Sequence, residues 1–256
     1  SFFDFFNGDY TQNAVFEAAH SDANVNLLAY TFSFGNGITA SLSIEDPSTS
    51  DDSGRRSTLG ALGGIYGGVH SPDLVANVNI SQAWGSAQIM GVLHDDVSAI
   101  HGVNSKVGYA IGGGVKVNLP MLGAASQIAL QAAYSKGALA YVSPSWAGAT
   151  AVDFGVDAGG SLRQNDGWGV AVGLTHGLTK TITANLEASY AQLRTDRALG
   201  NGDFNQWDVI GNLSWAPVSG LAITGELEYR NVDFSTASGL ADASALVGVL
   251  RVKRSF

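Results

Sequence analysis

Cysteine is absent from this chain of 256 residues, so disulfide bonds and thiolate metal sites are both excluded. Charged residues are scarce at 14%, against roughly a quarter in a typical soluble domain. Long apolar runs are missing too, and none approaches the about 20 residues that a membrane-spanning helix needs. The formal net charge of −9 argues against a nucleic-acid partner, because binding to phosphates requires a basic face.

What the chain does contain is a recurring alternation of apolar and polar residues, the period of a β-strand whose two faces differ. In residues 245–256, for example, Leu250 and Val252 share one face and Arg251 lies on the other. Such a pattern, over roughly the ten residues that a tilted membrane strand needs, occurs eleven times. The segments are residues 24–34, 38–46, 74–83, 86–94, 107–119, 126–135, 166–177, 181–193, 206–216, 221–233 and 245–256. A short extra strand is expected near 150–156.

Two kinds of closed barrel fit this alternation, a soluble barrel with an apolar interior and a membrane barrel with an apolar exterior. Polar side chains such as Asn185, Glu187 and Glu226 occupy mid-strand positions on one face, where a closed apolar core would leave them without partners. Aromatic residues on the opposite face lie mostly near strand ends, as in the girdles of membrane barrels: Tyr109, Tyr134, Trp168, Tyr190, Trp207, Trp215 and Tyr229. The sequence therefore predicts an all-β fold, a transmembrane antiparallel β-barrel around a water-filled lumen.

Short turns and long loops alternate strictly between the predicted strands. Residues 35–37 (Gly-Asn-Gly) are a strong signal for a tight turn, whereas 47–73 and 136–165 are long loops. In bacterial outer-membrane barrels the short turns face the periplasm, so we expect a periplasmic C-terminus. Residues 1–23 are aromatic, acidic and aperiodic, and we expect them on the extracellular side or folded inward from it.

Three short motifs resemble the alphaproteobacterial trimeric general-diffusion porins: Ser1-Phe2-Phe3-Asp4-Phe5, the turn Gln82-Ala83-Trp84-Gly85-Ser86-Ala87-Gln88, and Arg254-Ser255-Phe256. The resemblance extends over the whole chain. It implies an outer-membrane porin that passes small hydrophilic solutes and ions without a cofactor. It also implies a homotrimer in contact with outer-membrane lipid and lipopolysaccharide.

The same resemblance implies sixteen strands and a third extracellular loop that folds into the lumen after the fifth strand. We therefore predict a single β-barrel domain over 1–256, with 1–23 as an inward-folded constriction loop and 24–256 as barrel strands. The eleven predicted strands would then be the last eleven of sixteen. We expect a chain that lacks its N-terminal strands rather than a reduced barrel, because bacterial single-chain barrels have even strand numbers.

Charges at the narrowest ring of a pore select between ions, which makes seven residues candidates for the constriction. They are Asp4, Asp9 and Glu17 in the segment 1–23, and Lys116, Arg230, Arg251 and Lys253 on facing strands. An acidic loop opposite a basic wall would create a transverse field. Alternatively, these charges are simply solvated, or Glu187, Glu226 and Glu228 pair with Arg230 and Arg251 across strands.

Two other functions remain open from the sequence. The long loops 47–73 and 136–165 suit a plugged barrel that acts as a surface adhesin or structural anchor. A barrel hydrolase would rest on His94 alone, the one histidine near a rim on an inner face, with Asp95 and Asp96 beside it. No metal-binding spacing such as His-x-x-x-His occurs. We therefore expect neither an enzyme nor a metal site.

Overall fold

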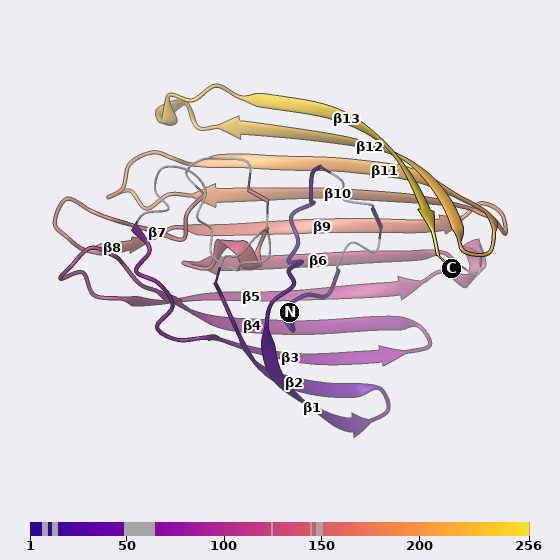
Figure 1. Cartoon of the computed structure of the whole chain (residues 1–256), viewed down its shortest axis with the longest axis horizontal. Coiled ribbons are helices and arrows are strands. Elements are labelled where there is room, and N and C mark those ends of the chain that lie inside the picture. The colour runs from indigo at the N-terminus through magenta and orange to yellow at the C-terminus, as the bar shows by residue number, and fades with distance from the viewer. Residues whose placement is uncertain are drawn as a thin grey trace.

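The computed structural model describes residues 1–6, 10–11, 15–48, 65–123, 125–143, 145–146 and 151–255. Within these residues, one antiparallel sheet of eleven strands follows chain order and curves around the N-terminal segment (Figure 1). Its strands are β1 (Leu27–Gly35), β2 (Ile38–Glu45), β3 (Asp73–Gln82), β4 (Gly85–Asp96), β5 (Lys106–Asn118), β6 (Gln127–Lys136), β9 (Asp166–Gly177), β10 (Ile182–Arg194), β11 (Phe204–Val218), β12 (Leu221–Phe234) and β13 (Ala243–Arg254). The all-β prediction and its eleven strands are confirmed.

Smaller elements lie between these strands. The strands β7 (Phe154–Val156) and β8 (Leu162–Gln164) form a separate two-stranded sheet, which places the predicted extra strand at 154–156 and adds a partner to it. Three short 3₁₀ helices are described: η2 (Pro120–Leu122), η3 (Leu139–Tyr141) and η4 (Thr236–Ser238). Among the described residues, no helix has the length and apolar character needed to cross a membrane.

The two faces of the curved sheet have opposite polarity. On the outer face, Leu28 and Leu250 keep 75% and 76% of their surface exposed. On the inner face, Glu187 and Asp208 are fully buried. A soluble barrel would show the reverse arrangement, because its apolar side chains pack inside. An apolar exterior over a polar interior is the arrangement of a transmembrane barrel wall, as the sequence predicts.

Aromatic side chains form a band on the outer face. The band lies at the end of the sheet where the long loops connect the strands. Neighbouring strands bring the rings together in three pairs: Tyr109 with Tyr134 (6.2 Å between ring centroids), Trp168 with Tyr190 (5.4 Å) and Trp207 with Tyr229 (5.0 Å). Trp84 and Trp215 lie at the opposite end, near the short turns. Amphipathic rings at both ends of an apolar band match the two interfaces of a membrane.

The connections alternate in length as predicted. The tight turn between β1 and β2 uses left-handed backbone at Gly35, Asn36 and Gly37, with φ of 82°, 51° and 76°. The chain returns just as sharply between β3 and β4 and between β11 and β12, whereas residues 97–105 and 137–165 are long connections on the other side. The short turns and the C-terminal end of β13 lie at the same end of the sheet (Figure 1).

Two inward segments outside the large sheet cover its inner face, the N-terminal segment 1–23 and the connection 137–165 after β6. Phe3 and Phe5 pack with Tyr141 and with wall residues such as Met90, and Phe6 and Tyr10 form a second cluster with Ala129 and Ala171. A third cluster joins the segment around Leu139, Val142 and Trp146 to Phe204 and Leu193 of the wall. Burying each large apolar side chain stabilises by about 1.5–3 kcal/mol, so both segments are held firmly against the wall.

Candidate functional site: the inner face and the inward segment

Glycines on the inner wall make room for aromatic side chains of the segment 1–23. A Cβ atom added at Gly114 of β5 would overlap the ring of Phe5. A Cβ atom added at Gly173 of β9 would lie 2.6 Å from Tyr10 Cγ and 2.7 Å from Phe6 Cζ. Because only glycine lacks this atom, these two positions let the segment approach the strands directly.

Wall side chains bind backbone N–H groups of the same segment. Phe2 N donates to Glu45 Oε1 at 2.9 Å, and Phe16 N donates to Glu228 Oε2 at 2.7 Å. Ala19 N donates to Ser189 Oγ at 2.9 Å. A segment without regular secondary structure has no internal partners for these donors, so wall acceptors supply them. The sequence pattern placed glutamates on this face but did not assign them this role.

His20 adds a side-chain contact to this attachment. Its Nε2 atom lies 3.0 Å from Glu187 Oε1 on β10, and each side chain is 1% exposed. Burial alone would lower the pKa of His20, but the hydrogen bond to Glu187 and the charges of Glu187 and Asp22 outweigh it and raise the pKa above its usual value. A protonated His20 would therefore hold the segment against β10. The sequence contained no signal for this pair.

Arg230 of β12 joins both inward segments to the wall. Its Nε atom donates to Asp208, its cross-strand neighbour on β11. Its Nη2 atom donates to the backbone oxygen of Glu17 at 2.7 Å, and Nη1 donates to that of Ser145 at 3.1 Å. The guanidinium also lies 4.9 Å from the centre of the Phe16 ring. The planar fork of arginine suits this role, because it donates in several directions at once.

The other predicted constriction residues lie in different parts of the structure. Asp4 is buried and accepts hydrogen bonds from Ser21 Oγ and, at 3.2 Å, from Ala23 N. Lys116 Nζ lies 5.2 Å from the centre of the Phe5 ring, while Arg251 and Lys253 are exposed on β13. Asp9 lies outside the described residues. Of the predicted constriction residues, Arg230 therefore contacts Glu17, through the backbone oxygen of Glu17, and Lys116 lies beside the segment 1–23.

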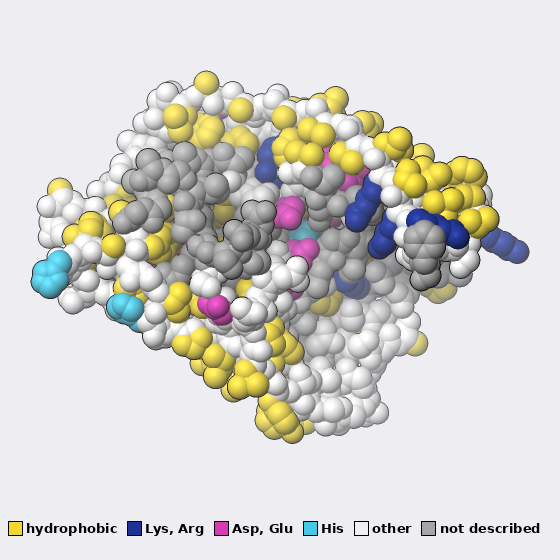
Figure 2. All heavy atoms as spheres, in the orientation of Figure 1, with side chains coloured by type: hydrophobic (Ala, Val, Ile, Leu, Met, Phe, Trp, Pro, Cys, Tyr) yellow, Lys and Arg dark blue, Asp and Glu magenta, His cyan; other side chains and the backbone are white. Residues whose placement is uncertain are grey.

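A ladder of polar side chains crosses the inner face beneath the segment 1–23. Thr175 Oγ1 donates to Asn185 Oδ1, Asn185 Nδ2 donates to Asn212 Oδ1, and Asn212 Nδ2 donates to Glu226 Oε2, each at 2.8 Å. The ladder therefore joins β9 to β12 through side chains as well as through the backbone. Figure 2 shows basic and acidic side chains gathered in the hollow of the sheet near these strands. The wall here is polar and charged, as a water-filled lumen requires.

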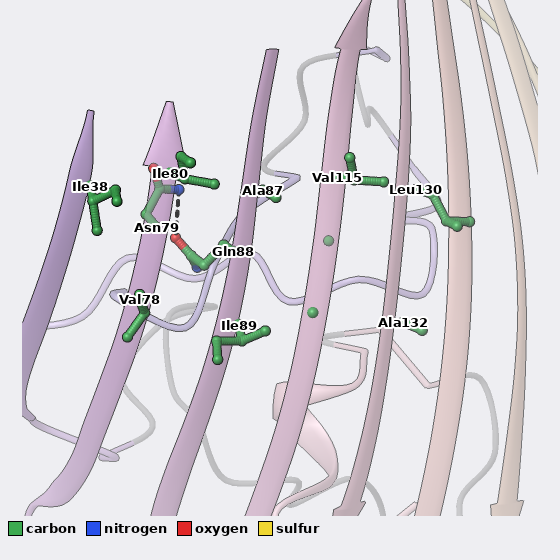
Figure 3. A pocket seen from close by; sticks show the side chains of 12 residues that line it. Ile38, Val78, Asn79, Ile80, Ala87, Gln88, Ile89, Val115, Leu130 and Ala132 are labelled. Atoms are coloured by element: carbon green, nitrogen blue, oxygen red, sulfur yellow. Dashed lines mark hydrogen bonds between the residues drawn. The ribbon is translucent and has the colours of Figure 1, made fainter. Parts of the chain in front are cut away.

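An apolar groove lies on the opposite, outer face of β2 to β6. Small residues form its floor, including Gly113 and Ala132, and Ile89, Val115 and Leu130 project around it (Figure 3). Asn79 donates to Gln88 at 3.3 Å on the inner side of the same strands. The groove holds no ionisable side chain, so it belongs to the apolar exterior and not to the candidate site.

The fold and this inner face define a class of protein: a membrane β-barrel whose polar interior carries an inward-folded segment. The family model described as Porin subfamily (Porin_2) matches residues 1–248, and the chain belongs to this family. The resemblance to alphaproteobacterial porins is thereby confirmed.

Individual relatives agree with this family. Porin Omp2b of Brucella suis biovar 1 (strain 1330) is 26% identical over 234 residues, which cover 90% of this chain and 51% of that protein. Porin Omp2b of Brucella melitensis biotype 1 matches with the same identity and coverage. The chain thus spans about half the length of the curated relatives it matches.

Two solved structures share the fold. The outer membrane channel DcaP of Acinetobacter baumannii superimposes with a TM-score of 0.80 at 18% identity, over all of this chain and 69% of that one. The anion-selective porin from Comamonas acidovorans gives a TM-score of 0.56 at 13% identity, over 91% of this chain and 60% of that one.

Proposed function

We propose that this protein is an outer-membrane porin, a water-filled channel through which small hydrophilic solutes and ions diffuse passively. The observation that carries the proposal is the polarity of the sheet, whose outer face exposes Leu28, Leu227 and Leu250 while its inner face carries a polar ladder. A channel needs an apolar surface toward lipid and a wettable surface inside. The proposal involves no covalent chemistry and no cofactor.

The alternation of short and long connections supports one orientation in the membrane. The short turns and the C-terminus would face the periplasm, and the long connections would face outward toward lipopolysaccharide. Residues 1–256 would form one barrel domain, within which 1–23 would narrow the lumen. A homotrimer is part of the proposal, and the apolar groove around Gly113 would contact lipid or a neighbouring subunit.

The ion preference would come from charges around the inward segment. Lys116, Arg251 and Lys253 would form the basic side of the constriction, and Asp4, Asp9 and Glu17 the acidic side. Arg230 would mainly hold the two inward segments in position, because its guanidinium donates hydrogen bonds to Asp208 and to the backbone oxygens of Ser145 and Glu17. The exposed Arg251 and Lys253 are the members best placed to meet a passing ion.

Conductance separates a channel from a plugged barrel. The conductance of the purified protein is recorded in a planar bilayer. In a separate experiment, the protein is inserted into liposomes, and its permeability to sugars of increasing size is measured from their swelling. We expect stepwise, ohmic conductance and a size cut-off for sugars. A protein that inserts but neither conducts nor passes sugars would be a plugged anchor or adhesin, and the porin proposal would be wrong.

Reversal potentials test the charge assignment. In a salt gradient, Arg251→Gln with Lys253→Gln should shift the reversal potential toward cation selectivity, because two basic groups leave the lumen wall. Lys180→Gln is a matched control, since Lys180 lies in the turn between β9 and β10 at the same end of the sheet. An unchanged reversal potential in the double variant would remove Arg251 and Lys253 from the constriction.

A further inference from the structure

Lysine and arginine are the only charged residues at one end of the sheet. This short-turn end comprises the short turns, the strand ends that adjoin them and the end of β13: residues 33–40, 79–88, 114–123, 125–129, 174–185, 212–225 and 250–255. These stretches contain five basic residues and no aspartate or glutamate: Lys116, Lys180, Arg251, Lys253 and Arg254. The rest of the chain holds the other eight of its 13 basic residues and all 22 acidic ones. Figure 2 shows dark blue side chains gathered toward this end.

Three of the five basic residues are on the inner face. Lys116 on β5 points inward, since its Nζ atom lies 5.2 Å from the centre of the inward Phe5 ring. Arg251 and Lys253 on β13 also face inward, because Arg251 is the cross-strand partner of Thr224, a buried inner-face residue of β12. Five strands separate β5 from β13 in the curved sheet, so the basic groups border the hollow on two sides.

The acidic residues of the inner face lie farther from the short turns. Three of them on β11 and β12 are buried: Asp208, Glu226 and Glu228. Asp4 of the inward segment lies 3.0 Å from the N-terminal amino group, and its side chain is 2% exposed. Arg251 and Lys253, in contrast, are exposed. An ion that approaches from the short turns therefore meets exposed positive charge before it meets these carboxylates.

The opposite, long-loop end has mixed charge. Three of its arginines each pair with an aspartate: Arg163 with Asp157 (2.7 Å), Arg194 with Asp166 (2.6 Å) and Arg197 with Asp203 (3.2 Å). Other acidic residues begin or end strands there, including Glu45, Asp73 and Asp96. An anion therefore meets no comparable concentration of positive charge at the long-loop end.

Like charges around an opening act together on an approaching ion. At an ionic strength of 0.1 M the Debye length is about 10 Å, so neighbouring basic groups contribute to one positive potential. Protein walls of low dielectric focus that potential into the opening and raise the local concentration of counter-ions by about 10- to 1,000-fold. The interaction energy is proportional to the charge of the ion, so multivalent anions are attracted most strongly.

We propose that the short-turn end is a basic mouth that concentrates small multivalent anions, such as polyphosphates, and holds them beside Arg251 and Lys253. Lysine and arginine are the residues that line pores for phosphate and other anions. The inference rests on the proposed porin function and adds a direction to it. Multivalent anions bind from the short-turn side, whereas the long-loop side attracts them little.

This difference between the two ends is separate from the transverse field that the sequence predicts between the segment 1–23 and a basic wall. It depends on which end of a strand each charge occupies, and the position of the segment 1–23 does not enter. A channel could therefore conduct and prefer one ion type without any difference between its two mouths, and the experiment below separates these properties.

Block of the current by tripolyphosphate tests the proposal. The current of single channels is recorded in a planar bilayer in about 0.1 M KCl, and tripolyphosphate is added to one compartment or, in separate recordings, to the other. We expect half-block from one side at a concentration at least tenfold lower than from the other. In about 1 M KCl, where the Debye length is only about 3 Å, this difference between the sides should shrink.

Two pairs of substitutions identify the mouth that binds the anion. Arg251→Gln with Lys253→Gln removes two charges from the short-turn end and should raise the blocking concentration on the sensitive side at least tenfold. Lys106→Gln with Lys136→Gln is the matched control, because these exposed lysines begin β5 and end β6 at the long-loop end. The control variant should keep the one-sided block.

Equal block from both sides, or one-sided block that survives Arg251→Gln with Lys253→Gln, would overturn the inference and leave the porin proposal intact. A protein that never conducts would contradict the porin proposal instead. The basic mouth is then tested by the heat of tripolyphosphate binding to the protein in detergent micelles. Saturable binding that the same two substitutions weaken at least tenfold would support an anion site at this end, and absence of such binding would overturn it.

Discussion

The ring of Phe5 lies over Gly114 of β5, where any larger residue would displace it. A Gly114→Val substitution should therefore lift the start of the segment 1–23 from the wall and expose Phe5, at a local cost of about 1.5–3 kcal/mol. We expect faster proteolysis within residues 1–23 of the folded protein, and larger mean conductance if the segment narrows the pore. Digestion followed by mass spectrometry measures the first effect, and bilayer recording the second.

The neighbouring Gly113 provides the control for this change. A Cβ atom at Gly113 would come no closer than 3.4 Å to another atom, and the residue faces the outer groove. Gly113→Val should therefore leave digestion of the segment unchanged. Equal digestion of both variants would mean that Phe5 does not hold the segment on the wall.

Removal of Arg230 should destabilise the protein strongly. Arg230→Met leaves Asp208 buried without its ion-pair partner, which typically costs about 3–5 kcal/mol. Urea unfolding followed by tryptophan fluorescence measures this loss. Adding Asp208→Asn should recover part of it, because the uncompensated charge is then gone.

The stability cost of breaking the Arg230–Asp208 pair can be compared with that of breaking an exposed ion pair on the same sheet. Arg194 Nη2 lies 2.6 Å from Asp166 Oδ2, but the arginine side chain is 51% exposed. Arg194→Met should cost only about 0–1 kcal/mol, because water screens such a pair. Similar losses for Arg194→Met and Arg230→Met would show that burial does not decide the strength of these pairs.

The contact between His20 and Glu187 should make attachment of the inward segment depend on pH. The pKa of His20 is raised in the folded protein, despite burial, by the hydrogen bond and charge of Glu187 and by Asp22. The stabilisation is then fully present below about pH 6.5, the value for unfolded histidine, and is lost as the pH rises through the higher folded pKa. We expect proteolysis within residues 1–23 to accelerate in that range.

Cleavage of an unfolded substrate at each pH corrects for the activity of the protease itself. His20→Asn should abolish the pH dependence, whereas His101→Asn, at an exposed histidine, should preserve it. A pH profile that is the same with and without His20 would contradict its role as the titrating contact.

A charge on the outer face should oppose insertion into the membrane. Leu227 in the middle of β12 is 63% exposed, and Leu227→Lys should destabilise the protein by about 2–4 kcal/mol if it lies at the bilayer midplane. Thr183→Lys is the matched change on the inner face and should be tolerated much better. Urea titration of both variants in lipid vesicles compares them, and a neutral Leu227→Lys would argue against a lipid-facing surface.

The alternation of residues determined the strands and their faces from the sequence. Successive side chains of a strand point to opposite sides, so Leu227 and Glu228 could be assigned to opposite faces without any knowledge of their neighbours. Observed strand ends differ from the prediction by up to a few residues, as β1 begins at Leu27 instead of residue 24. Alternation is local, whereas the end of a strand depends on where its partner strand stops pairing.

Only the tertiary structure decided which inner-face residues contact one another. Arg230 pairs with Asp208 rather than with the predicted glutamates, and its contact with Glu17 joins residues 213 positions apart. The same holds for Phe5 on Gly114, His20 on Glu187 and Asp153 beside His94. Such contacts depend on how far the sheet curves and how deeply the inward segments fold. The sequence therefore determined which residues face the lumen, and only the fold determined which of them meet there.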